Sequence, residues 1–160
     1  VEVPADPANP DGKKRQILRH PGAVTILPFV DDNHICLIRN YRVSVGKELL
    51  ELPAGTLEPD EPHAVTAKRE LIEETGYRAK KLTYLHSFYL SPGILDENMH
   101  LYIASDLTQG QAAREEGELI TNYIVSWKET LQLIKDCKIC DAKSIAGILM
   151  YDQLKRSGEI

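Results

Sequence analysis

The chain has 160 residues, of which 42% are hydrophobic and 27% charged, and its formal net charge at pH 7 is −5. This length fits a single domain, and the composition is typical of a water-soluble globular protein. No apolar run approaches the roughly 20 residues that a membrane-spanning helix needs, and the negative charge argues against binding to the phosphate backbone of nucleic acids. We therefore expect neither membranes nor nucleic acids as partners.

The cysteine content favours a reducing cytoplasm as the location. Three cysteines, Cys36, Cys137 and Cys140, are too few and too unevenly placed for the disulfide framework of a secreted domain. Cys137 and Cys140 form a C-x-x-C pair, but it lacks the second ligand pair or preceding strand that a zinc or redox site needs. The chain starts at Val1 without a signal-like segment, so we expect a trimmed N-terminus rather than a targeting peptide.

Residues 1–20 are predicted to form an N-terminal arm, and residues 21–160 the main domain. Val1–Gly12 holds three prolines and little apolar periodicity, which favours an extended segment over a packed element. Two short apolar runs follow, at Val24–Val30 and His34–Arg39. The Asp-Asp-Asn sequence between these runs favours a turn, so together they predict a β-hairpin.

The remaining sequence predicts one central helix, several strands and two C-terminal helices. From about Glu61 to Thr75, Ala64, Ala67 and Leu71 recur at helical spacing, and Gly76 stands where a helix terminator is expected. The other predicted elements are strands at Leu49–Pro53, Leu82–Tyr89, Met99–Ala104 and Tyr123–Ser126, and helices at Trp127–Lys135 and Ser144–Lys155. This order predicts a mixed α/β architecture with sheet between helices, and not a doubly wound parallel sheet.

Three carboxylates gather on one face of the predicted central helix. Glu70 and Glu74 are one turn apart and Glu73 sits beside them, so all three project towards a common point. Exposed like-charge pairs cost only about 0.2–0.5 kcal/mol each, so a solvated acidic stripe is the alternative interpretation. The pattern around these glutamates favours a metal site instead.

Magnesium prefers hard oxygen ligands, usually one or two carboxylates together with substrate phosphates. Glu70 and Glu74 supply carboxylates, and Ala54 can add its backbone carbonyl. Gly55 is interpreted as permitting a backbone turn that a side chain forbids, and Arg69 as pairing with a glutamate to hold it in place. Bound Mg²⁺, or Mn²⁺ in its place, would let an acidic protein bind an anionic diphosphate.

The segment from Gly55 to Tyr77 has the spacing G-x5-E-x7-R-E-U-x-E-E-x-G-U, where U is apolar. It resembles the Nudix box at every specified position, with Tyr77 a loose match for the last U. The resemblance extends over most of the chain and points to the ADP-ribose pyrophosphatase branch, through His20–Val24, Asn40–Arg42, Glu48–Gly55 and Ser91–Gly93. It implies the Nudix fold, a mixed β-sheet sandwiched between α-helices.

The resemblance also implies roles outside the box. Arg42 would contact the diphosphate or the terminal ribose, because a guanidinium suits phosphate oxygens, and its alternative is a surface arginine. Glu51 would hydrogen-bond the substrate or a metal-bound water, or else be an ordinary strand-end glutamate. Pro92, about fifteen residues past the box, is assigned to substrate binding. Glu97 would pair locally or shape the pocket.

A late acidic loop is expected to supply the last carboxylate. Glu118 would activate the attacking water or bind a further metal ion, with Glu116 as the second candidate and a merely solvated loop as the alternative. The expected catalytic residues are Arg69, Glu73, Glu74 and Glu118, and the expected metal ligands are Ala54, Glu70, Glu74 and Glu118.

The implied reaction is in-line attack of a metal-activated water on the diphosphate of ADP-ribose, which gives AMP and ribose 5-phosphate. Members of this branch generally exchange N-terminal strands in a homodimer and hold adenine with an aromatic residue or arginine there. Val1–Gly12 contains no aromatic residue, which leaves the substrate open. The alternatives are another nucleoside diphosphate sugar, such as a GDP-sugar, or a Nudix-fold sensor that binds ADP-ribose or NAD without cleaving it. Such sensors usually lose box glutamates, and here all are present.

Overall fold

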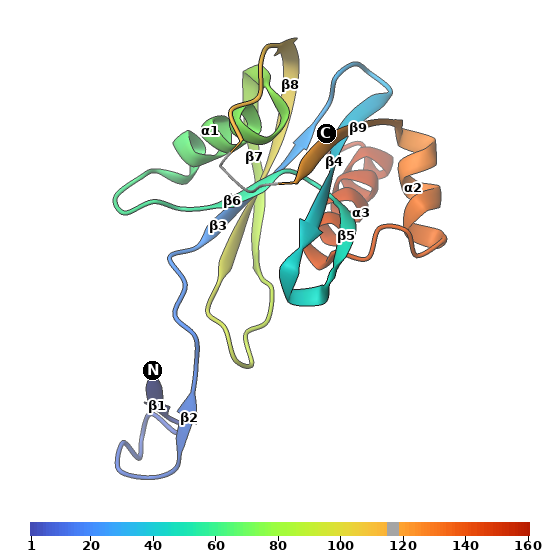
Figure 1. Cartoon of the computed structure of the whole chain (residues 1–160). Coiled ribbons are helices and arrows are strands. Elements are labelled where there is room, and N and C mark those ends of the chain that lie inside the picture. Colours follow the sequence, from blue (N-terminus) through green and yellow to red (C-terminus); the bar gives the residue numbers. More distant parts are fainter. Residues whose placement is uncertain (115–118) are drawn as a thin grey trace.

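A computed structural model describes residues 1–114 and 119–160 (Figure 1). The elements in chain order are β1 (Glu2–Pro4), β2 (Lys14–Gln16), β3 (Ala23–Pro28), β4 (His34–Arg42), the 3-10 helix η1 (Val43–Val45), β5 (Lys47–Glu51), β6 (Ala54–Thr56), α1 (His63–Thr75), β7 (Tyr77–Tyr89), β8 (Asn98–Gln109), β9 (Ile120–Ser126), α2 (Trp127–Lys135) and α3 (Ala142–Ser157).

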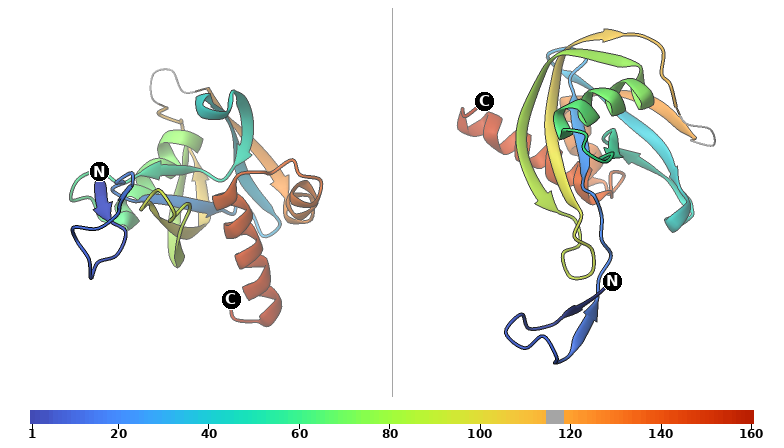
Figure 2. Two further views of the ribbon diagram at one scale, coloured as in Figure 1. Left: turned by 90° about the horizontal axis from the view of Figure 1, so that it is seen from below. Right: turned by 90° about the vertical axis from the view of Figure 1, so that its left-hand side faces the viewer.

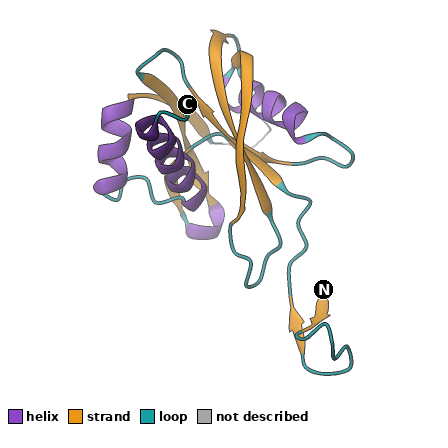
Figure 3. Ribbon diagram, turned by 180° about the vertical axis from the view of Figure 1, so that it is seen from behind, coloured by secondary structure: helices purple, strands orange, loops and turns teal. Residues whose placement is uncertain are grey.

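Two sheets lie between helices, as Figure 3 shows from behind. A four-stranded mixed sheet has the order β6-β3-β8-β7, with β3 and β8 parallel and the other pairs antiparallel. An antiparallel three-stranded sheet has the order β5-β4-β9. Helix α1 covers one side of this arrangement, and α2 and α3 cover the other. The predicted mixed α/β architecture is therefore confirmed.

Strand β3 is the centre of the hydrophobic core because both of its faces are covered. All six of its residues are buried. Side chains alternate along a strand, so Val24 and Ile26 pack with the residues of α1, while Leu27 joins the cluster beneath α2 and α3. The continuous apolar run that identified this strand in the sequence reflects this double burial.

The predicted hairpin between β3 and β4 forms only at its turn. The strands are bridged where Phe29 meets Ile35, and the Val30 amide donates to the His34 carbonyl at 2.9 Å. Beyond this point β3 enters the four-stranded sheet and β4 the three-stranded sheet. The turn was predicted correctly, but the pairing was wrong, because β3 pairs with β6 and β8 while β4 pairs with β5 and β9.

The central helix matches its prediction closely. It spans His63–Thr75 and ends at Gly76, whose φ of 81° is left-handed and whose amide donates to the Ile72 carbonyl. Strand β7 starts earlier than predicted, at Tyr77, because its first residues alternate charged and apolar side chains along the edge of the sheet. Among the described residues, none of the helices is long and apolar enough to span a membrane.

The N-terminal residues contain strands where an unpaired extended arm was expected. β1 and β2 form a two-stranded sheet of their own, with Glu2 opposite Gln16. Figure 2 shows this ribbon projecting away from the sandwich. Leu18 and Ile94 connect its base to the β7–β8 loop, since the Leu18 amide donates to the Ile94 carbonyl at 2.7 Å.

Candidate functional site

A hollow of about 430 Å³ lies between α1 and the loop that precedes it. The acidic face of α1 lines it on one side and the short strand β6 on the other. The residues that surround it are Asn40, Arg42, Ala54, Gly55, Thr56, Leu57, Glu58, Pro59, Arg69, Glu70, Glu73 and Glu74. We call it the acidic hollow.

Strand β6 brings the backbone of Ala54 and Gly55 against two of the glutamates. Glu74 is only 4% exposed, and its Oε2 accepts a hydrogen bond from the Ala54 amide at 2.9 Å. A β-carbon on Gly55 would coincide with the carboxylate of Glu70. The φ of Gly55 is not among the positive values of this chain. The expected reason for the glycine, a special turn, is therefore wrong, and close approach of Glu70 explains it instead.

Arg69 binds three glutamates at once. Its Nη1 donates to Glu70 Oε1 at 2.7 Å and to Glu73 Oε2 at 2.9 Å, while its Nε and Nη2 form a two-bond pair with Glu61 at 3.2 and 3.0 Å. The hydrogen bonds that Arg69 donates to Glu61 lower the pKa of Glu61 below its ordinary value. The same bonds are the largest cause of the raised pKa of Arg69. Arg69 thus holds the acidic face in place, as expected for a pairing residue.

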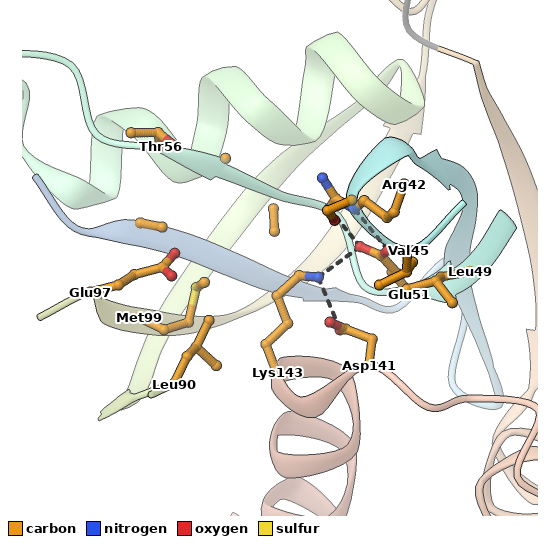
Figure 4. A pocket seen from close by; sticks show the side chains of 14 residues that line it. Arg42, Val45, Leu49, Glu51, Thr56, Leu90, Glu97, Met99, Asp141 and Lys143 are labelled. Atoms are coloured by element: carbon orange, nitrogen blue, oxygen red, sulfur yellow. Dashed lines mark hydrogen bonds and ion pairs between the residues drawn. The ribbon is translucent and has the colours of Figure 1, made fainter. Parts of the chain in front are cut away.

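A second hollow, of about 390 Å³, opens on the other side of β6 (Figure 4). It shares Arg42, Ala54, Gly55 and Thr56 with the acidic hollow, so the two hollows are adjacent. Its remaining walls come from η1, β5, the β7–β8 loop and the start of α3. We call it the Arg42 pocket.

A buried ionic network forms one wall of the Arg42 pocket. Arg42 donates through Nε and Nη2 to the two oxygens of Glu51, at 2.9 and 2.6 Å. Lys143 donates to Glu51 Oε2 at 2.7 Å and to Asp141 Oδ2 at 2.9 Å. Glu51 is fully buried and Lys143 is 5% exposed. The hydrogen bonds that Arg42 donates to Glu51 are the largest cause of the raised pKa of Arg42.

The network is tied to the fold at the N-terminus of α3. Asp141 caps this helix, since its Oδ2 accepts from the Ser144 amide at 3.0 Å and from the Ser144 hydroxyl at 2.6 Å. The Ser144 hydroxyl in turn accepts from the Leu52 amide at 2.7 Å. The cap therefore fixes β5 and α3 relative to each other, and with them Glu51 and Lys143.

Comparison with known proteins identifies the family. The model of the NUDIX domain matches residues 19–146, most of the chain. The chain belongs to the NUDIX family. The family expected from the sequence is thereby confirmed.

Relatives and structures agree with this assignment. The ADP-ribose pyrophosphatase of Bacillus subtilis is 41% identical, over 92% of this chain and 82% of its own. The methanol dehydrogenase activator of Bacillus methanolicus is 40% identical, over 98% of this chain and 83% of its own. A crystal structure of an ADP compounds hydrolase matches with a TM-score of 0.82 and 28% identity, covering 96% of this chain and 84% of that one.

The fold brings together most of the residues that the NUDIX box singled out. Ala54, Glu70 and Glu74 meet at β6 and α1, and Glu73 lies on the same face, bound to Arg69. Within residues 1–114 and 119–160, however, no three His, Cys, Asp or Glu side chains are already gathered around one point as a metal site. Glu118, and the second candidate Glu116, lie outside the described residues.

Two residues of the β7–β8 loop were expected to contribute to the site. Glu97 lines the Arg42 pocket, and its carboxylate lies 4.0 Å from the imidazole of His20. Pro92 is exposed in the same loop and is not one of the residues that line the pocket, whereas Leu90 is. The assignment of Pro92 to substrate binding stays a prediction.

Sequence reasoning missed Asp141 and Lys143. The predicted helix started at Ser144, so these residues were placed in a loop. One signal could have found the first of them, because Asp141 precedes Ser144 by three residues, the spacing of an N-cap. Lys143 carried no such signal, since its partner Glu51 is 92 residues away in the sequence.

Proposed function

We propose that this NUDIX protein hydrolyses the diphosphate bond of ADP-ribose with a divalent cation, giving AMP and ribose 5-phosphate. The observation that carries the proposal is the adjacency of the two hollows at β6. The acidic face of α1 and the wall that presents Arg42 lie on either side of Ala54, Gly55 and Thr56. A diphosphate that carries a different group at each end suits such a pair of adjacent hollows.

The residues of the acidic hollow fit Mg²⁺ by their chemistry. Glu70 and Glu74 offer carboxylate oxygens and Ala54 a carbonyl oxygen, which are hard ligands. Gly55 leaves room for the Glu70 carboxylate beside the strand. A bound cation would polarise the phosphorus and make water a better nucleophile. Mn²⁺ is the alternative, because these ligands also accept it.

The chain's own residues would orient the substrate and the acidic face. Arg42 presents a partly exposed guanidinium, 38% accessible, to the pocket, where it suits a phosphate oxygen. Arg69 and Glu61 would keep Glu70 and Glu73 directed towards the hollow without contacting substrate. Glu51 accepts hydrogen bonds from Arg42 and Lys143, which favours a role in holding Arg42 over direct contact with substrate. Glu118 remains our candidate for the group that accepts the proton of water.

Our proposal extends to assembly and location. We propose a homodimer in which the ribbon of β1 and β2, which projects from the sandwich, crosses to the partner. The cysteine content favours a cytoplasmic enzyme. Sedimentation of the chain with and without residues 1–16 tests the dimer, because loss of the ribbon should give a monomer.

The test of the activity is hydrolysis of ADP-ribose with and without Mg²⁺, with AMP detected as product. Glu74→Gln should lower kcat by more than about 100-fold, because it removes a carboxylate from the cation site while keeping an acceptor for the Ala54 amide. The matched control is Glu129→Gln on exposed α2, which should leave kcat unchanged. Unchanged turnover in Glu74→Gln would contradict the metal assignment.

A substrate screen separates this proposal from its alternatives. ADP-ribose, NADH, a GDP-sugar and a dinucleoside polyphosphate are compared at equal concentration with Mg²⁺. Preference for the GDP-sugar would identify it as the substrate in place of ADP-ribose. The proposed reaction would be unchanged. Tight binding of ADP-ribose or NAD without any product would instead identify a sensor.

A further inference from the structure

We propose that Lys143 is a positioning residue that sets the charge of the Arg42 pocket and thereby keeps the Arg42 guanidinium available to an anionic group of the substrate. The inference rests on the proposed function and concerns the same site. Lys143 acts through Glu51 and does not touch the substrate itself.

Burial explains why Lys143 acts indirectly. It belongs to the first turn of α3, is 5% exposed, and directs its ammonium inward to Glu51 and Asp141 (Figure 4). An ammonium has three donors, and two of them are used by these carboxylates. A side chain enclosed in this way is poorly placed to bind a ligand in the open part of the pocket.

Glu51 transmits the effect because one of its oxygens is shared. Oε2 accepts from both Arg42 Nη2 and Lys143 Nζ, at 2.6 and 2.7 Å. Lys143 therefore competes with Arg42 for the same carboxylate charge. This leaves Arg42 with positive charge that Glu51 does not neutralise and that faces the pocket.

The charges of the network balance only when Lys143 is present. Arg42 and Lys143 oppose Glu51 and Asp141, so the wall is formally neutral. Without Lys143, two carboxylates face one guanidinium and the wall becomes negative. Glu97, on the opposite side of the pocket in Figure 4, adds a further carboxylate. A phosphate entering between these walls would be repelled, and the repulsion is strong because the groups are poorly solvated.

Four variants separate this charge effect from a loss of packing. Lys143→Met removes the charge and keeps an unbranched apolar side chain of similar length. Lys143→Arg keeps the positive charge at this position. Asp141→Asn removes one carboxylate and retains the helix cap, since asparagine caps as well as aspartate. The double variant Lys143→Met with Asp141→Asn has one cation and one anion, and is neutral again.

The measurements are calorimetric binding of ADP-ribose in EDTA, steady-state hydrolysis with Mg²⁺, and thermal unfolding. We expect Lys143→Met to raise Kd and KM about tenfold with a much smaller change in kcat. Lys143→Arg should bind as the wild type does. The double variant should recover most of the lost affinity, although it lacks more native contacts than the single one. Asp141→Asn alone should bind about threefold tighter than the wild type.

The outcomes separate the inference from the proposed function. A wild type that neither binds nor hydrolyses ADP-ribose overturns the proposed function, and the inference with it. An active wild type whose affinity is unaltered in Lys143→Met overturns the inference alone. If Lys143→Met does not fold, Asp141→Asn decides, because affinity equal to or weaker than that of the wild type contradicts the charge argument.

Discussion

Two ionic clusters flank β6, and they differ in the balance of their cationic and anionic side chains. On α1, Arg69 meets Glu61, Glu70 and Glu73, with Glu74 nearby, so carboxylates outnumber the single guanidinium. At the start of α3, Arg42 and Lys143 match Glu51 and Asp141 one for one. The first cluster keeps an excess of negative charge and the second keeps none.

The difference follows from what each cluster is expected to hold. A surplus of carboxylates is what a divalent cation needs. Glu51 and Lys143 of the second cluster are enclosed, and desolvated charge is costly unless it is paired. The two clusters should therefore respond differently to the loss of one partner.

Breaking the buried cluster should have the largest effect on stability. Glu51→Gln leaves Lys143 enclosed with one carboxylate fewer, so we expect the free energy of unfolding to fall by about 3 kcal/mol. Arg42 contributes less to this loss because its side chain reaches solvent. Urea denaturation measures the free energy of unfolding, with Glu129→Gln as the control. A loss of less than about 1 kcal/mol would contradict the assignment of a buried ion pair.

Displacing one carboxylate of the α1 cluster should reduce activity and leave stability largely intact. A methyl group on Gly55 would occupy the position of the Glu70 carboxylate, which is the mobile end of a side chain and can move aside. We expect Gly55→Ala to lower kcat about 10- to 100-fold. Gly93→Ala, where an added β-carbon meets nothing within 4 Å, is the matched control and should be active. Full activity of Gly55→Ala would show that the Glu70 carboxylate need not lie beside residue 55.

The smallest predicted effect is the contribution of the Arg69–Glu61 pair to stability at low pH. Because Arg69 lowers the pKa of Glu61 from 4.5, the folded protein keeps this carboxylate charged at a lower pH than the unfolded chain does. The stabilisation is fully present above pH 4.5 and is lost as the pH falls below that value. Between pH 5 and 3, in EDTA, the Tm of the wild type should therefore fall more than that of Glu61→Gln.

A control variant tests whether the change in Tm is specific to the Arg69–Glu61 pair. Glu48→Gln, on an exposed position of β5, removes a carboxylate outside both clusters. It should retain the acid response of the wild type. Parallel curves for the wild type and Glu61→Gln would show that the Arg69–Glu61 pair adds nothing to acid stability.

The sequence predicted the α1 cluster well because its members are local. Arg69, Glu70, Glu73 and Glu74 occupy little more than one helical turn, and helical spacing alone places them on one face. The network around Lys143 could not be predicted in this way. Its members come from β4, β5 and α3, and only the pairing of β4 with β5 and the capped start of α3 brings them together. For the same reason the β3–β4 turn was predicted and the division of its strands between two sheets was not.

The thin partition formed by β6 allows ligand selectivity to diverge without disturbing the reaction centre. Its three residues are small. Leu49, Leu90 and Met99 border the Arg42 pocket but not the acidic hollow. Substitutions at these three positions would change the Arg42 pocket, which we propose receives a sugar or a base, without touching the acidic face of α1. One scaffold can in this way serve relatives that differ in the molecule they accept.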